Sequence, residues 1–153
     1  MSLPDDDRRL FFLLDRAAHA FRERIDAMCR ARLGVSAVQL VALLLVARAD
    51  GMRPGELAAA LGTKAGAVTG LVDRMEAAGL VKRRADKDDA RVQRLHVTAA
   101  GRHAIDSAKP VVAAANRVLA KHFNPDELAI AARFLRVMAE LDWESLVPPG
   151  EPP

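Results

Sequence analysis

Cationic side chains are the residues with the clearest chemical capacity, and they concentrate in the middle of the 153-residue chain. Residues 51–98 hold nine Arg and Lys against six Asp and Glu, a balance of +3, whereas the preceding and following segments carry +1 and −1. The densest run is Lys82-Arg83-Arg84, and Arg91 ends the polar stretch that follows. Guanidinium and ammonium groups bind phosphate oxygens through charge-assisted hydrogen bonds. The pattern indicates an anionic partner, although a solvated run of charge explains each residue taken alone equally well.

Catalytic and metal-binding patterns are missing from the same sequence. There is no phosphate-binding loop, no dinucleotide fingerprint and no HExxH motif. The histidines lack ligand spacing; they are His19, His96, His103 and His122. Cys29, the single cysteine, cannot form an internal disulfide, and a position near the end of a helix disfavours its thiolate and hence redox sensing. We expect a protein that is not an enzyme and that needs no metal or cofactor.

The composition favours one folded domain outside the membrane. Hydrophobic residues make up 51% and charged residues 28% of the chain. The longest apolar run, residues 40–47, is far shorter than the roughly 18–20 residues that cross a bilayer. The first residues include Asp5, Asp6 and Asp7, whereas a signal peptide begins with positive charge. These features predict a cytoplasmic protein with no membrane partner.

Apolar periodicity predicts a mainly helical first half. Apolar residues recur every three or four positions over residues 6–32, which indicates one long amphipathic helix. Ser36 is a suitable N-cap for a second helix that reaches about Ala49, and its nearly uniform apolar sequence predicts burial on all sides. Residues 54–61 and 63–78, the latter with Thr63 as the candidate N-cap, form two short helices of helix-turn-helix dimensions.

A short hairpin and two more helices complete the predicted order. Residues 80–84 and 92–97 are typical of two β-strands around a polar tip. Thr98 begins a helix that reaches about residue 123 and that Pro110 should kink, and Asn124 begins the last helix. A helix-turn-helix followed by a hairpin is a winged helix, whose second helix can enter a major groove while the hairpin reaches a neighbouring minor groove.

Two motifs, the second in two parts, resemble the multiple-antibiotic-resistance regulator (MarR) family of transcriptional regulators. Residues 62–83, GTKAGAVTGLVDRMEAAGLVKR, are similar to that family's recognition-helix segment. Residues 86–91, DKDDAR, and 95–101, LHVTAAG, resemble its wing and the helix that follows, in the same order and spacing. The similar helix arrangement covers about residues 6–146. The resemblance implies a homodimer that binds palindromic double-stranded DNA, usually as a repressor, and that a small-molecule effector often releases.

The same resemblance implies which regions of the chain, within one structural domain, bind DNA and which form the dimer. Residues 36–98 are the expected winged helix-turn-helix region, residues 1–35 and 99–147 the expected helical dimerisation region, and residues 148–153 a disordered tail. Dimerisation would cover the large apolar side chains near both ends of the chain, although packing within one chain is the alternative. These expected interface residues are Leu10, Phe11, Phe12, Phe134, Leu135, Met138, Leu141 and Trp143.

The predicted recognition helix has an apolar side and a side of small residues. The spacing of Val68, Leu71, Val72 and Met75 predicts that they face the core. Glycines inside an exposed helix cost about 1 kcal/mol each relative to alanine, so those on the opposite side favour close approach to a groove over an ordinary solvated surface. The expected DNA contacts of this helix and the wing are Thr63, Lys64, Ala65, Gly66, Thr69, Gly70, Arg74, Lys82, Arg84, Asp89 and Arg91.

Two arginines need separate treatment. Arg74 either grips a phosphate or is the buried partner of a carboxylate. In the family, the Arg of an Asp-x-Arg pattern enters the minor groove and the Asp orients it, which implies these roles for Arg91 and Asp89. Ala90 departs from the second Arg that many relatives carry, which lowers the expected electrostatic attraction. Otherwise the aspartates of the tip, Asp86, Asp88 and Asp89, would hold the turn and pair with Arg91 and Lys87.

An effector site follows only from position within the family pattern. The residues that would line it are Phe21, Ile25, Met28, Val41 and Leu45, for each of which a place in the plain core is the alternative. The function with the next best support is a winged-helix module that binds a protein, or DNA in an architectural role, without a dedicated operator. A steep salt dependence and a strong preference for one DNA sequence would separate an operator-binding regulator from such a module.

Overall fold

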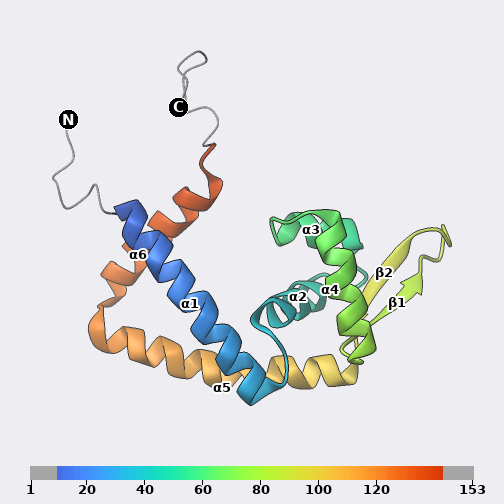
Figure 1. Ribbon diagram of the computed structural model, residues 1–153, viewed down its shortest axis with the longest axis horizontal. Helices are drawn as coiled ribbons and strands as arrows, with labels where there is room; N and C mark the ends of the chain where they lie inside the picture. The colour runs from blue at the N-terminus through green and yellow to red at the C-terminus, as the bar shows by residue number, and fades with distance from the viewer. Residues whose placement is uncertain (1–9, 143–153) are drawn as a thin grey trace, which may run out of the picture. The chain divides into compact units, whose positions relative to one another are not determined.

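The computed structural model describes residues 10–142, which form mainly helices and one antiparallel hairpin (Figure 1). The helices are α1 (Leu10–Leu33), α2 (Ala37–Arg48), α3 (Pro54–Ala60), α4 (Ala65–Ala77), α5 (Ala99–His122) and α6 (Pro125–Glu140), and the strands are β1 (Val81–Ala85) and β2 (Gln93–Val97). The order and the mainly helical class agree with the sequence prediction. The chain forms two compact units that divide within α5, between Lys109 and Pro110.

Most predicted boundaries are confirmed within a few residues, but the start of α4 is not. Lys64, rather than Thr63, occupies the N-cap, and its side chain makes no capping hydrogen bond. Thr63 instead completes the end of α3, where its amide donates to the carbonyl of Ala58 at 3.0 Å. Gly62 precedes it with φ +61°, the left-handed conformation of a helix C-terminal turn. The predicted helical residues before Leu10, Trp143 and the predicted tail lie outside the described residues.

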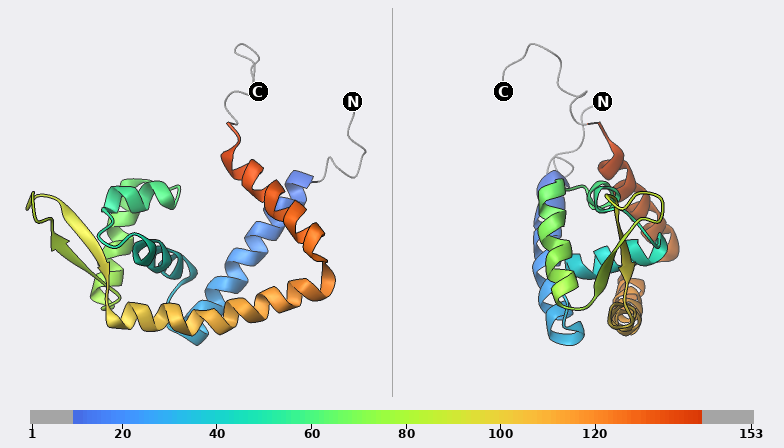
Figure 2. Two further views of the ribbon diagram at one scale, coloured as in Figure 1. Left: turned by 180° about the vertical axis from the view of Figure 1, so that it is seen from behind. Right: turned by 90° about the vertical axis from the view of Figure 1, so that its right-hand side faces the viewer.

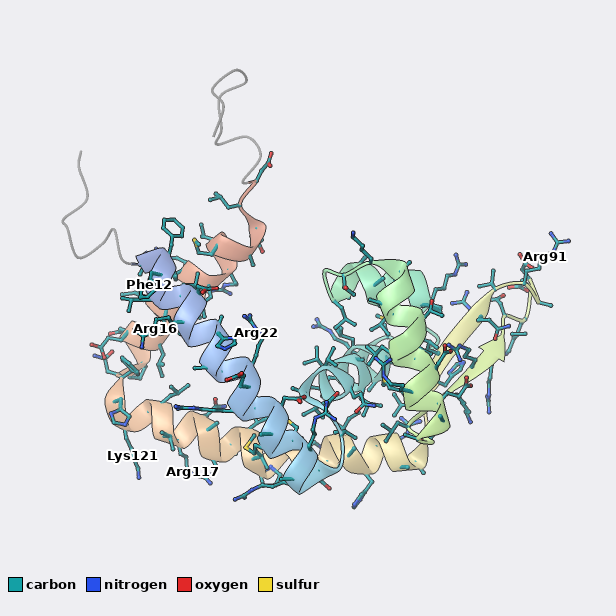
Figure 3. All side chains as sticks on the ribbon, in the orientation of Figure 1. Phe12, Arg16, Arg22, Arg91, Arg117 and Lys121 are labelled. Carbon is teal, nitrogen blue, oxygen red and sulfur yellow. The ribbon has the colours of Figure 1, made fainter. Side chains whose placement is uncertain are left out.

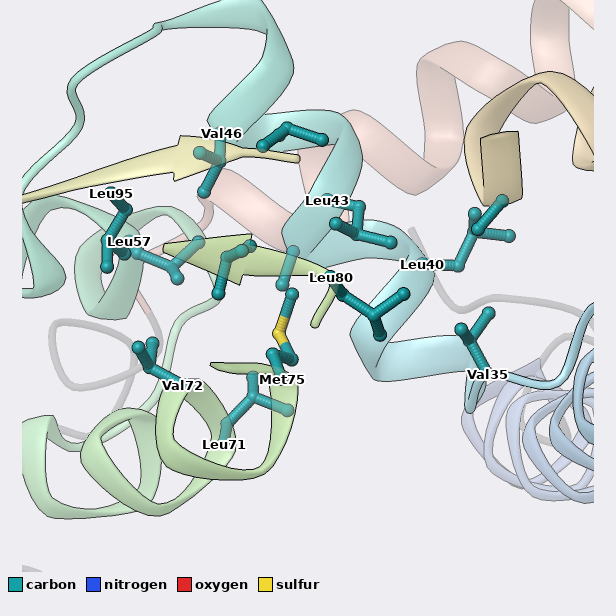
Figure 4. Close-up of a cluster of buried hydrophobic side chains, with 14 of the residues drawn as sticks. Val35, Leu40, Leu43, Val46, Leu57, Leu71, Val72, Met75, Leu80 and Leu95 are labelled. Atoms are coloured by element: carbon teal, nitrogen blue, oxygen red, sulfur yellow. The ribbon is translucent and has the colours of Figure 1, made fainter. Parts of the chain in front are cut away.

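The core of the first unit lies between α2, α3, α4 and the hairpin (Figure 4). Leu43, Leu57, Met75 and Leu95 are fully buried in it, one from each of these four elements. The prediction that α2 is buried on all sides is wrong, because Val38, Val41 and Leu44 remain 46–48% exposed on one side of the helix. The hairpin and α3 pack against the other side of α2. The side chains of α2 are apolar on the covered side and on the exposed side alike.

The junction of α1 and α2 is held by polar side chains that satisfy the first turn of α2. Ser36 and Gln39 form a reciprocal capping box, as the N-cap prediction required. Asp26 of α1 accepts a hydrogen bond from the amide of Ala37 at 2.9 Å and another from the Arg30 side chain at 2.7 Å. The Arg30 bond, followed by the Ala37 bond, lowers the pKa of Asp26. A carboxylate at this helix N-terminus fixes where α2 leaves α1.

Thr98 and Gly101 join the hairpin to α5. The Thr98 hydroxyl lies 2.6 Å from the Gly79 carbonyl and 3.1 Å from the Leu80 carbonyl, and it accepts the amide of Gly101 at 3.1 Å. Gly101 is buried where α5 crosses the start of β1. A Cβ at this position would overlap the Leu80 carbonyl oxygen and lie 2.7 Å from a methyl group of Val97. The hydrogen bonds of Thr98 and the lack of space for a Cβ at Gly101 are the physical reasons for a Thr-x-x-Gly sequence at this junction.

The second unit contains the end of α5 from Pro110 onward and α6. Asn124 caps α6 and forms a capping box with Glu127, which confirms the predicted start. Side chains of both helices line an apolar groove of about 720 Å³, including Leu119, Phe123, Ile130 and Leu135.

Among residues 10–142 no single helix is long and apolar enough to span a membrane, whereas α1 and α2 taken together across a 74° bend meet that test.

Replacing Gly101 by alanine should destabilise the first unit by about 1–3 kcal/mol, because the added methyl group overpacks a site bounded by a backbone carbonyl. Gly66→Ala is the matched control, since a Cβ there meets nothing within 4 Å. The control should be neutral or stabilising by up to about 1 kcal/mol through helix propensity. Urea unfolding followed by circular dichroism measures both, and equal midpoints for the two variants would contradict the expectation.

Candidate nucleic-acid interface

The helix α4 is anchored on one side and open on the other. Val68, Leu71, Val72 and Met75 are at most 5% exposed, as their spacing predicted. On the outer side Ala65, Gly66, Thr69, Asp73 and Arg74 are exposed, and Gly70 is half-buried. The outer side of α4 and the turn before it therefore present most of the predicted small-residue surface to solvent. Thr63 and Lys64, both exposed, lie at the start of this surface.

Arg83 ties the end of α4 to strand β1. Its guanidinium bonds to Asp73 at 2.5 Å and also to Glu76, while its backbone amide donates to Glu76 at 2.9 Å. The backbone bond and then the side-chain bond lower the pKa of Glu76. In the sequence, Arg83 stands out only as part of the basic run of residues 82–84. The signal available was a cation seven residues after Glu76, across the turn between helix and strand.

Arg74 is exposed, and it has no ion-pair partner among residues 10–142. The alternative in which it is the buried partner of a carboxylate is therefore wrong, and Arg83 fills that structural role. The Arg74 guanidinium folds back over Gly70, where a Cβ would lie 3.4 Å from its Nη1. Its cation remains available at the edge of the outer surface of α4.

The hairpin projects beyond α4 (Figure 1; Figure 2). Its register pairs Lys82 with His96 and Arg84 with Arg94. Lys82 and Arg84 flank half-buried Arg83 and lie on one exposed side of β1. Arg91 lies at the outer end of the hairpin, away from the helices of this unit (Figure 3). Asp89 accepts a hydrogen bond from the backbone amide of Arg91 at 3.0 Å, so in this structure it shapes the turn rather than binding the guanidinium.

The partners expected for Asp86, the first residue of the hairpin tip, are wrong. Asp86 binds the Arg94 side chain rather than Arg91 or Lys87, and Arg94 also donates to the Gly51 carbonyl at 3.0 Å. The amide of Asp88, followed by Arg94, lowers the pKa of Asp86. The register places Arg84 opposite Arg94, and the Asp86 carboxylate bound to Arg94 offsets the repulsion between these two like charges.

The other predicted site residues occupy two kinds of environment. Ile25, Met28 and Leu45 pack against the core, as their alternative interpretation held, whereas Phe21 is 63% exposed and Val41 is also exposed.

Cys29 is buried, and burial raises the pKa of its thiol, which opposes thiolate formation. Within residues 10–142 no group of three or more His, Cys, Asp or Glu side chains could hold a metal ion.

Known proteins share both the sequence and the fold of this chain. The MarR family model matches residues 33–92. The chain is 32% identical over 115 residues to the uncharacterised HTH-type transcriptional regulator YcgE of Bacillus subtilis, with 74% of each chain covered. The transcriptional repressor CouR, bound to a 23-mer DNA duplex, is 25% identical with a TM-score of 0.79, over 92% of this chain and 99% of its own. The S. aureus MepR–DNA complex is 19% identical with a TM-score of 0.75, over 89% and 96%.

The sequence relationship and the winged-helix geometry point to the same activity. The matched residues 33–92 include α2, α3, α4 and β1, the elements that build the candidate interface. The relative with 32% identity extends the match to about three quarters of the chain. This chain belongs to the MarR family and is a DNA-binding transcriptional regulator.

Proposed function

We propose that this regulator acts in the cytoplasm as a homodimer on a palindromic operator, with α4 in the major groove and the hairpin in the adjacent minor groove. It represses transcription until a small-molecule effector releases it. The observation that carries the proposal is the open, small-residue surface of α4 beside a hairpin that ends in Arg91, a guanidinium with no ion-pair partner among residues 10–142. The DNA-bound structures of CouR and MepR support the use of this fold on DNA.

The exposed cations are suited to hold the phosphate backbone on either side of α4. Lys64 lies at the start of the helix, while Lys82 and Arg84 lie on the exposed side of β1. None of the three forms an ion pair within the described chain. Such contacts fix the register of a protein on DNA and make its affinity fall as salt rises. Arg91 adds a cation suited to the negative potential of a narrow minor groove.

Large exposed apolar residues support the dimer. In the second unit Ile130, Leu135 and Val137 are more than half exposed, next to the apolar groove. In the first unit Leu10 and Phe12 are exposed on α1. Apolar surface of this extent is typical of an interface. A two-fold dimer that reads successive major grooves must hold its two α4 helices about 34 Å apart.

The proposed effector site uses the apolar side chains that the core of the first unit leaves partly uncovered. Phe21 and Val41 are exposed, and Ile25, Met28 and Leu45 are half-buried beside the core. Apolar walls of this kind suit a small molecule with an apolar body. A ligand that binds the DNA-free arrangement more tightly would release the operator by mass action.

The direct test is an anisotropy titration with the DNA immediately upstream of the reading frame, against scrambled DNA, at two salt concentrations. Binding to the upstream segment that is salt-sensitive and at least about 10³-fold tighter than to scrambled DNA supports an operator-binding regulator. A protein- or architectural-DNA-binding module would show neither the preference nor a steep salt slope. Equal weak binding to both DNAs therefore counts against a dedicated operator in that segment.

Arg91→Ala should weaken operator binding by about 1–3 kcal/mol and reduce the salt slope, because it removes the minor-groove cation from each half of the dimer. Arg24→Ala, which removes an exposed arginine from α1, is the control and should bind normally. Light scattering should show an unchanged dimer for both variants. An unaltered affinity of Arg91→Ala at fixed salt would contradict the wing assignment.

Arg83→Met should weaken operator binding roughly tenfold, about the effect of losing one phosphate contact. The reason is that Asp73 and Glu76 would then face the DNA as uncompensated carboxylates. The unfolding free energy should fall by only about 1 kcal/mol, because Asp73 is 59% and Glu76 38% exposed. Adding Asp73→Asn and Glu76→Gln removes both charges and should restore affinity; a triple variant as weak as Arg83→Met would refute the electrostatic explanation.

Leu135→Glu should convert the dimer largely to monomer and weaken operator binding more than tenfold, because a charge in an apolar interface costs desolvation energy and one half-site loses its partner. Arg136→Glu, on the same helix but outside the groove lining, makes an even larger change of charge without placing a carboxylate in the groove, and it should leave the dimer intact. Light scattering across a concentration series measures the dimer. A Leu135→Glu protein that stays dimeric at every concentration would exclude this surface.

A further inference from the structure

We propose that α4 reads its half-site mainly through the methyl groups of thymine, with Thr69 as the specificity-determining residue. The inference rests on the proposed placement of α4 in the major groove. It adds which chemical feature of the base pairs the helix recognises. Thymine alone presents a methyl group on the floor of the major groove, so an apolar contact there distinguishes it from the other bases.

The hydroxyl of Thr69 is already used inside the helix. Its Oγ1 donates to the carbonyl oxygen of Ala65 at 3.2 Å, one turn earlier. Thr69 nevertheless remains exposed. With the hydroxyl turned toward the backbone, the γ-methyl is the group that this side chain offers outward. The methyl group of Ala65, also exposed, is its neighbour one turn back. Together they form a methyl patch at the N-terminal end of α4.

The outer surface of α4 lacks the side chains that read the other bases by hydrogen bonds. Adenine is read by Asn or Gln and cytosine by Asp or Glu. The exposed and half-buried outward positions hold neither amide, and their carboxylates, Asp73 and Glu76, are both bonded to Arg83. The free cations Lys64 and Arg74 lie at the start and the edge of this surface, where they suit phosphate or guanine. Apolar contact is therefore the main direct readout left to its centre.

The glycines bring this methyl patch close to the base pairs. Gly66 has no atom within 4 Å of the position of a Cβ, and Gly70 has only the Arg74 guanidinium, at 3.4 Å. Neither glycine has positive φ, so neither is required by the helix backbone. Two missing side chains next to Thr69 remove the bulk that would hold the backbone away from the groove floor. A single γ-methyl can then reach the C5 position of thymine.

The test replaces thymine by uracil, which removes the C5 methyl and leaves every hydrogen-bonding group in place. The probe is the tightest duplex that the full-length protein selects from a random-sequence library, with deoxyuridine placed at one half-site position at a time. We expect roughly a fourfold loss of affinity at one or two positions per half-site, the value of one buried methyl-sized group. Thr69→Ser keeps the hydroxyl and should lose this sensitivity at one position. Thr69→Val keeps the methyl and should retain it.

The outcomes separate this inference from the function on which it rests. A selected duplex whose affinity is unchanged by uracil at every position would overturn methyl readout and leave operator binding intact. Uracil losses that persist in full in Thr69→Ser would exclude Thr69 as the reading residue. Failure to select any duplex would overturn the proposed operator binding and this inference together. Circular dichroism melting of both exposed-site variants shows that they are folded.

Discussion

Val68, Leu71, Val72 and Met75 bury one side of α4, and the candidate interface depends on that burial. Full burial of an aliphatic side chain of this size contributes about 1.5–3 kcal/mol, whereas an exposed ion pair contributes at most about 1 kcal/mol. The apolar contacts with α2, α3 and the hairpin therefore decide where α4 lies. Because the inner side is fixed so strongly, the outer side can carry glycine and alanine, which contribute little to stability but expose the backbone.

Ion pairs act on this scaffold by deciding which charges reach the surface. Arg83 pairs with Asp73 and Glu76 on α4, and Arg94 pairs with Asp86 at the start of the hairpin tip. His96 pairs with Asp50 at 3.0 Å beside the same loop that Arg94 reaches through Gly51. The two arginines together engage three carboxylates. The cations outside these pairs include Lys64, Arg74, Lys82, Arg84 and Arg91, all of them exposed at α4 or on the hairpin.

Local patterns made the elements predictable, and distant partners were the part that local patterns could not supply. Ser36 and Asn124 predicted helix starts correctly because a capping side chain bonds within three residues. Arg94 donates to the Gly51 carbonyl, 43 positions earlier in the chain, and no sequence periodicity indicates a contact at that separation. The apolar sequence of α2 predicted complete burial, but periodicity cannot say whether the chain has enough neighbours to cover every side. The site residues on α4 were identified as the complement of a core pattern, which is why that surface was predicted better than the ion pairs beside it.

The uncovered side of α2 and the apolar groove of the second unit bear on how binding could be controlled. Val38, Val41 and Leu44 expose apolar surface on one side of α2, and the other side of this helix packs against α3 and β2. A ligand alters DNA affinity only through a difference in its binding to two arrangements of the protein. In the proposed dimer, the quantity that such arrangements change is the separation of the two α4 helices, which successive major grooves fix near 34 Å. Since α4 is anchored to α2 through a closely packed core, a ligand on the uncovered side of α2 would act on that separation by moving the winged helix as a rigid body, without unfolding the interface itself.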